Sequence, residues 1–254
     1  MIELHDGNYQ EFVETIQSES PHLLGALPRR GGLGQIMNAT PYADTIELIP
    51  KSQWQSRIEG MQGRFIRQKY DSYKPVHQNQ GQHPLCWDYA ATQHVECKRA
   101  GEGLPYVQLA PESILGCNGY RDSGGELSVA VKWLAEHGIA PRVYWPQYCF
   151  DPRQAKAGWQ DVALGCVVLK WLELGTEDMA AEVITAICDG KAVYTAYNRL
   201  RHAMNAEEFQ WKNGGPSLWL RNTWQVTDSM LMSGNLWVPD EAYVMEQVTY
   251  STSL

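Results

Sequence analysis

The sequence predicts an α+β fold built in two lobes. Helical patterns dominate the first half of the chain, and runs of strand-forming residues dominate the second half. A chain of 254 residues, of which 44% are hydrophobic, is long enough to bury a substantial core. We find no internal repeat along the chain.

The first 50 residues are expected to form a short helix and an arm, ahead of a main domain over residues 51–254. Four apolar residues recur at helical spacing and would form one face: Tyr9, Phe12, Val13 and Ile16. Prolines and glycines then break every pattern from Pro21 to Pro50, with Arg29-Arg30 in the middle. We interpret this stretch as an extended, flexible connector.

The sharpest helical pattern runs from Pro84 to Gly101. Proline suits a first helical turn, where its missing N–H costs nothing, and glycine suits the residue that ends a helix. An apolar stripe and a basic last turn complete the pattern: Trp87, Ala90, Ala91, Val95, Lys98 and Arg99. Cys86 is therefore expected at the N-terminus of this helix.

Two further helices are expected over Glu126–His137 and from Thr176 to Gly190. The strand-like runs are Cys166–Leu172, Ala192–Tyr197, Ser217–Arg221 and Leu236–Val238. This order places a helical lobe at about residues 75–150 and a β-rich lobe at about residues 160–250.

Charge and composition exclude several classes of protein. The net charge of −8 argues against a nucleic-acid partner, which would need a basic surface. No run approaches about 18 consecutive apolar residues, so no membrane span is expected. The first residues lack the pattern of a signal peptide, which favours the cytoplasm or a soluble or viral assembly. Without a Cys-x-x-Cys or His-Glu-x-x-His motif, the sequence predicts no metal site and no cofactor.

One of the six cysteines has a physical reason to be reactive. The N-terminus of a helix carries partial positive charge and unpaired N–H groups, which favour the nucleophilic thiolate. Cys86 is expected at such a position. Cys97, Cys166 and Cys188 lie inside apolar periodic segments and are expected to be buried core residues.

The neighbours of Cys86 carry a recognisable pattern. Asn79-Gln80-Gly81 precedes it by six residues, counted from Gln80, and Trp87 follows it directly. Similar segments follow at residues 109–119, 123–125 and 137–149. The region from Lys74 to Cys149 resembles the active-site half of the papain-like cysteine peptidases. In the second half, His202-Ala203 and Asn222-Thr223-Trp224 resemble the segments that carry the catalytic His and Asn of that family.

The resemblance implies a two-lobed papain-like fold and hydrolysis of peptide or isopeptide bonds through an acyl-enzyme, with a peptide or protein as substrate. It assigns the nucleophile and an oxyanion N–H to Cys86, a second oxyanion donor to Gln80, and the acid–base role to His202. Asn222 would orient the imidazole and Trp224 would shield it. Gly124 and Gly125 would leave room for the backbone of an extended substrate.

The chain also departs from the family pattern. His83 and Asp122 stand where secreted members carry a disulfide, whereas Cys117 and Cys149 match a second bridge and are a candidate disulfide. His202 follows Cys86 by 116 residues, short of the usual span of about 130–150. The residues after His202 include Asn and Glu where a buried apolar strand is usual, which is also compatible with an exposed His202.

Two other functions fit the same residues. The chain could be an inactive papain-like fold that serves as a structural or assembly subunit, for example of a virion, with the arm reaching to a partner. The same Cys and His constellation also supports other acyl transfers, such as transamidation or amide hydrolysis of cell-wall peptides.

Overall fold

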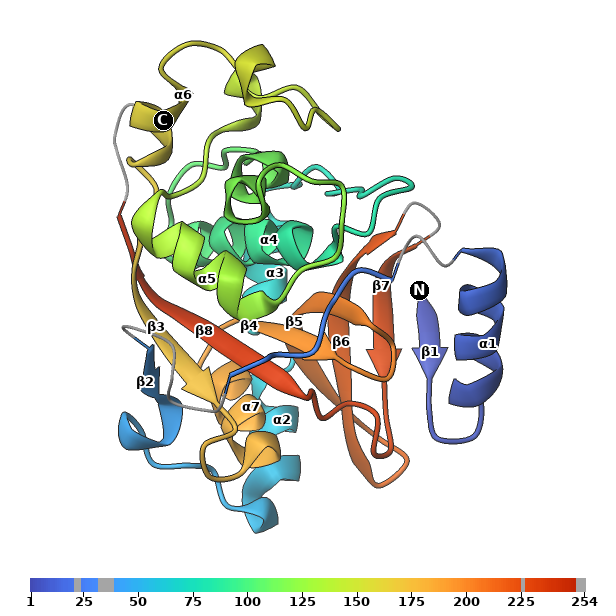
Figure 1. Cartoon of the computed structure of the whole chain (residues 1–254). Coiled ribbons are helices and arrows are strands. Elements are labelled where there is room, and N and C mark those ends of the chain that lie inside the picture. The colour runs from blue at the N-terminus through green and yellow to red at the C-terminus, as the bar shows by residue number, and fades with distance from the viewer. Residues whose placement is uncertain (21–23, 32–38, 225–226, 250–254) are drawn as a thin grey trace.

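The computed structural model describes residues 1–20, 24–31, 39–224 and 227–249 (Figure 1). Two pieces of the predicted arm, residues 21–23 and 32–38, lie outside this description. The helices are α1 (Tyr9–Glu19), α2 (Trp54–Met61), α3 (Ile66–Asp71), α4 (Cys86–Gly101), α5 (Leu127–Glu136), α6 (Trp159–Ala163) and α7 (Met179–Cys188). Short 3-10 helices are η2 (Tyr42–Asp44), η3 (Lys51–Gln53), η4 (Pro111–Asn118), η5 (Arg142–Tyr144) and η6 (Pro152–Gln154).

The described strands form one sheet in the order β1-β7-β6-β5-β4-β8-β3-β2. They are β1 (Ile2–Leu4), β2 (Ala39–Pro41), β3 (Val168–Leu174), β4 (Val193–Tyr197), β5 (His202–Lys212), β6 (Gly215–Trp224), β7 (Thr227–Met232) and β8 (Glu241–Val248). The inner pairs are antiparallel, whereas β1 pairs with β7 and β2 with β3 in parallel. The first 50 residues thus supply both edge strands.

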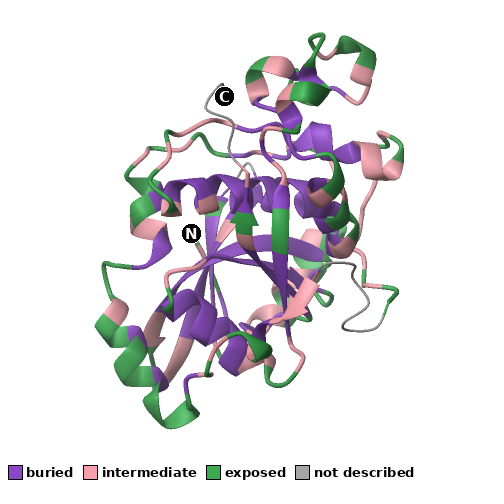
Figure 2. Ribbon diagram, turned by 90° about the vertical axis from the view of Figure 1, so that its left-hand side faces the viewer, coloured by how far each residue is buried: buried purple, intermediate pink, exposed green. Residues whose placement is uncertain are grey.

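Two apolar cores correspond to the two predicted lobes. One core surrounds α4 and α5, and the other lies between the sheet and helices α2 and α7. Helix α4 contacts β4, β5, β6 and β8, so the cysteine helix lies directly against the sheet. Figure 2 shows the buried residues gathered where helices and strands meet, with exposed residues at the periphery. The α+β, two-lobe prediction is confirmed.

Most predicted elements are present, with two corrections. Helix α4 begins at Cys86, so Pro84 precedes the helix instead of lying in its first turn. Leu236–Val238 forms turns and not a strand. Leu236 and Trp237 are apolar because they pack in the core of the β-rich lobe, and this apolar run was mistaken for a strand. The sequence patterns missed the adjacent strands β7 and β8.

The polar residues that follow His202 are buried within β5, each with a partner. Asn205 bonds to His94 on α4, Glu207 pairs with Arg221 on β6, and Glu208 pairs with Arg67 on α3. Such pairing offsets the cost of burying polar groups. His202 itself is fully buried, which overturns the interpretation of an exposed residue.

No helix in the described ranges combines the length and apolar character needed to cross a bilayer.

Candidate active site

Cys86 is the first residue of α4 and is completely buried. Its neighbour Trp87 anchors the turn, because the indole N–H donates to the Ser123 carbonyl at 3.2 Å. The Tyr194 hydroxyl from β4 donates to the carbonyl of the same tryptophan. The helix N-terminus is therefore held by both lobes, and the position of the thiol is set by residues distant in sequence.

His202 and Asn222 form a hydrogen-bonded pair at 2.7 Å, between imidazole Nε2 and amide Oδ1. The same Oδ1 accepts the Thr223 backbone N–H at 2.8 Å, so this atom is an oxygen and Nε2 must carry the proton. In the neutral imidazole, Nδ1 is then the basic nitrogen. Among the described residues Nδ1 has no hydrogen-bond partner, although it is buried. The imidazole is thus oriented with one nitrogen held and the other available to accept a proton.

Trp224 lies against this pair. Its ring lies 4.4 Å from the imidazole of His202, measured between centroids. Phe12 of α1 stacks on Trp224 at 6.1 Å. The N-terminal helix is thereby packed against the residue that contacts the imidazole.

The thiol of Cys86 lies beside the segment that carries His202. The backbone groups that act on the thiol are those of Ala203, the residue after the histidine, and of Gly25 and Ala26 from the arm. Burial raises the pKa of Cys86 to about 11, with the Asp88 carboxyl acting in the same direction and these backbone groups opposing it. Burial also lowers the pKa of His202 to about 4. Near neutral pH both groups are therefore uncharged in this structure.

Gln80 lies against the strand that carries Asn222. Its Oε1 accepts a hydrogen bond from the Thr223 hydroxyl, and its Nε2 donates to the His83 carbonyl at 2.7 Å. Both ends of the Gln80 amide are therefore held by hydrogen bonds.

The arm lies against the predicted substrate glycines. Gly125 donates to the Gly25 carbonyl and accepts from the Leu27 N–H, both at 3.0 Å, and the Ala26 N–H donates to the Arg201 carbonyl at 2.9 Å. Figure 1 shows this blue segment crossing in front of the strands of the sheet. The described part of the arm is therefore a bound, extended peptide and not a free connector.

Glycine is required on both sides of this crossing. A Cβ at Gly25 would lie 1.9 Å from the Pro84 carbonyl oxygen, and one at Gly124 would lie 2.5 Å from the Gly25 carbonyl oxygen. A Cβ at Gly125 would meet the Trp87 ring at 2.5 Å. The close approach of backbone to backbone leaves no room for side chains there.

One prediction about the cysteines, the candidate disulfide, is wrong. Cys86, Cys97, Cys166 and Cys188 are buried free thiols, but Cys117 and Cys149 are also free, so the candidate bridge is not formed. The Cys149 thiol donates to the Asp151 carbonyl at 3.4 Å and packs in a different apolar cluster from Cys117. At the other family disulfide position, His83 Nδ1 and Asp122 Oδ2 form a contact of 2.7 Å that connects the same two segments.

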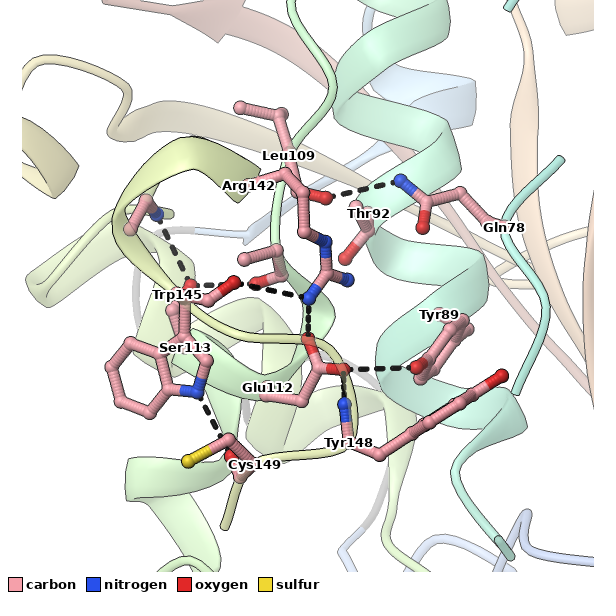
Figure 3. Close-up of polar contacts among 12 residues, drawn as sticks. Gln78, Tyr89, Thr92, Leu109, Glu112, Ser113, Arg142, Trp145, Tyr148 and Cys149 are labelled. Carbon is pink, nitrogen blue, oxygen red and sulfur yellow. Dashed lines mark hydrogen bonds and ion pairs between the residues drawn. The ribbon is translucent and has the colours of Figure 1, made fainter. Parts of the chain in front are cut away.

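Two buried carboxyl groups near the site were not predicted. Burial raises the pKa of Asp88, two residues after the cysteine, well above its usual value, with the nearby Glu112 adding to the effect. Glu112 is bound by Arg142 at 2.7 Å, by the Tyr148 N–H at 2.7 Å and by the Tyr89 hydroxyl at 3.1 Å (Figure 3). This network ties α4 to η4 and to the 142–149 segment. The sequence did carry one signal for these groups, because Asp88 is an acidic residue in an otherwise apolar turn of the predicted helix.

His94 shows what a structural histidine looks like in the same protein. Its Nδ1 donates to Asn205 at 2.7 Å and its Nε2 accepts the Met245 N–H at 3.1 Å, so both nitrogens are used. Burial lowers its pKa to about 4.

This shift predicts acid destabilisation. Between about pH 6.5 and 4 the unfolded chain protonates His94 while the folded chain does not, so stability falls as pH falls. Relative to His94→Gln, the wild-type chain should lose up to about 3 kcal/mol across this window. Urea unfolding at a series of pH values measures the difference. Parallel curves for the two proteins would contradict the shift.

No protein-family model matches the sequence, and no curated protein is similar to it in sequence. Solved structures do match. A proCathepsin B from Trypanosoma congolense superposes with a TM-score of 0.60 at 16% identity, over 95% of this chain and 98% of the other. Xylellain, a cysteine protease from Xylella fastidiosa, matches with a TM-score of 0.59 at 14% identity over 91% and 97%. Procathepsin L 3 of Tenebrio molitor matches with a TM-score of 0.56 at 14% identity over 92% and 78%. The architecture of this chain is therefore the papain-like fold.

Proposed function

We propose that this chain is a latent cysteine peptidase that hydrolyses peptide or isopeptide bonds through a Cys86 acyl-enzyme. One observation carries the proposal: His202 is held by Asn222 through Nε2, while its basic Nδ1 is buried without a partner among the described residues. A structural histidine such as His94 uses both nitrogens instead. This is the arrangement that a general base next to a thiol requires.

In the proposed reaction the Cys86 thiol gives its proton to His202 Nδ1, and the sulfur attacks the carbonyl carbon of the substrate. The Cys86 backbone N–H and the Gln80 amide donate to the oxyanion. The imidazolium then returns the proton to the amine as the C–N bond breaks, which leaves a thioester on Cys86. Water then gives a proton to the same imidazole and attacks the thioester carbon, and the imidazolium returns that proton to the Cys86 sulfur as the C–S bond breaks and the acid is released.

The arm explains why we propose a latent form. Residues 25–27 hydrogen-bond to Gly125 and Arg201 across the site, and burial keeps the Cys86 thiol uncharged at neutral pH. Three of the similar structures are described as procathepsins. In the proposed latent form, the arm must leave the site before a substrate can bind.

Labelling by a peptidyl epoxide tests the proposal. In a Gly25→Val chain, whose arm cannot pack against Pro84, we expect the reagent to modify Cys86 and to inhibit cleavage of a mixed peptide library. Cys86→Ala should abolish both effects, whereas Cys117→Ser, which removes the most accessible thiol, should change neither. Intact-mass and peptide-mapping spectra identify the labelled site. Faster labelling of Cys117 than of Cys86, with no library cleavage, would overturn the proposal.

The bound arm also favours one alternative, an inactive fold with a structural role, because the arm of the chain occupies the place of a substrate. That alternative predicts no Cys86-dependent turnover even after the arm is displaced. The labelling and cleavage assays therefore separate the two functions.

A further inference from the structure

We infer that the cleft contains a pocket for a basic side chain, formed by Glu173, Glu241 and Tyr243, and that Arg29 of the arm fills it as an internal substitute for substrate. The inference rests on the proposed function and names the class of substrate: peptides with Arg or Lys at one fixed position near the scissile bond.

Arg29 is inserted into the sheet side of the cleft. Its side chain is only 10% exposed, and it forms an ion pair with Glu173 of β3, whose side chain is 1% exposed. The guanidinium also donates to the Tyr243 hydroxyl of β8 at 3.1 Å. A buried, charge-assisted contact of this kind contributes more than a surface pair, provided that both partners are present.

Arg30, the next residue, provides the contrast within the same arm. It pairs with Glu126 at 3.1 Å, but its side chain is 83% exposed. Exposed ion pairs contribute little to stability. The two adjacent arginines therefore differ in environment, and Arg29 is the one that occupies a built site.

A second carboxyl extends the pocket beyond Glu173. Tyr243 donates its hydroxyl proton to Glu241 Oε1 at 2.6 Å, while Glu241 Oε2 is buried without a hydrogen-bond partner among the described residues. Burial raises the pKa of Glu241, with the bond from Tyr243 and the charge of Arg29 opposing the rise. A cation in the pocket thus stabilises a carboxylate that is otherwise costly to ionise.

The space around these groups is acidic and not fully occupied. A cavity of about 520 Å³ is lined by Glu173, Asp240 and Glu241, and Arg29 is the basic residue among its described lining residues. This leaves room beside the arginine for the neighbouring residues of an extended peptide.

The pocket lies within a few residues of the thiol along a bound peptide. Ala203, whose backbone contacts the Cys86 thiol, pairs with Ala196 of β4, and Ala196 pairs with Glu241 of β8. Two strand spacings correspond to roughly 10 Å. Arg29 in the pocket follows Gly25, beside the thiol, by four positions, a comparable reach for extended backbone.

Peptide binding tests the pocket without requiring catalysis. The probe is a labelled peptide with the sequence of residues 24–31, titrated into a Cys86→Ala chain that also carries Gly25→Val to vacate the cleft. We expect the probe to bind about 10-fold or more tightly than the same peptide with Gln in place of Arg29, with Lys between them. Fluorescence anisotropy measures the affinities.

Variants of the pocket identify its residues. Glu173→Gln and Glu241→Gln, each nearly isosteric, should remove most of the difference between the Arg and Gln peptides. Glu59→Gln, at an exposed carboxyl on α2, should leave that difference unchanged. Equal affinities of the Arg and Gln peptides for the unmodified pocket would overturn the inference.

Cleavage-site profiling in the chain with Cys86 intact provides the second readout. We expect Arg and Lys to be enriched at one fixed position relative to the cleaved bond, and Glu241→Gln to reduce that enrichment. Cys86-dependent cleavage without any basic preference would count against the pocket alone. Arg-selective binding without any cleavage would support the pocket and count against the proposed peptidase activity.

Discussion

Substituting Gly25 with valine is expected to raise Cys86-dependent peptidase activity on the order of 10-fold or more. The new Cβ would lie 1.9 Å from the Pro84 carbonyl oxygen and 2.3 Å from its carbonyl carbon. Both are backbone atoms next to the cysteine helix, so no side-chain rotation relieves the overlap. Destabilising the arm-bound form by only about 1.4 kcal/mol shifts the equilibrium between the arm-bound and arm-released forms tenfold.

The measurement is the initial rate of peptide-library cleavage, compared between the wild-type and Gly25→Val chains. Gly60→Val is the matched control, because a Cβ at Gly60 meets nothing within 4 Å. Faster trypsin cleavage at Arg29-Arg30 would show independently that the arm has been displaced. A displaced arm with no gain in activity would contradict latency.

Replacing His202 with glutamine is expected to lower turnover by roughly 10³-fold in the arm-released chain. The imidazole is proposed to carry the proton from the thiol to the leaving amine, and general acid–base steps of this kind contribute about 10²–10⁴. Glutamine keeps a hydrogen bond to Asn222 within reach but cannot accept and return the proton. The loss should therefore be in kcat, with little change in peptide binding.

His94→Gln is the matched control for this substitution. His94 is as buried as His202, and burial lowers the pKa of both residues to about 4, but its two nitrogens are occupied by Asn205 and Met245. We expect this variant to lose stability while retaining kcat within about twofold once folded. Equal losses of kcat in the two variants would show that the effect of His202 is structural.

The candidate site was predictable to the extent that local patterns specify it. The position of Cys86 at a helix N-terminus follows from proline, the apolar stripe and the final glycine around it. Asn222 and Trp224 follow from a short motif on a strand-like run. In contrast, His202 could not be assigned from its own neighbours, because Asn205, Glu207 and Glu208 resemble an exposed segment. Their partners, in the same order, are His94, Arg221 and Arg67, which lie on other elements.

The sequence by itself determined the α+β class, the helix that presents Cys86 and the family that the site resembles, because these depend on periodicity and short motifs within single elements. Only the tertiary structure decided that His202 is buried, that Cys117 and Cys149 are unlinked, and that residues 25–27 of the arm lie across the site. Each of these depends on contacts between residues far apart in the chain. The hydrogen bonds of Ala26 and Leu27 to Arg201 and Gly125 have no signature in the Pro- and Gly-rich arm itself, because the backbone groups that form them are common to every residue.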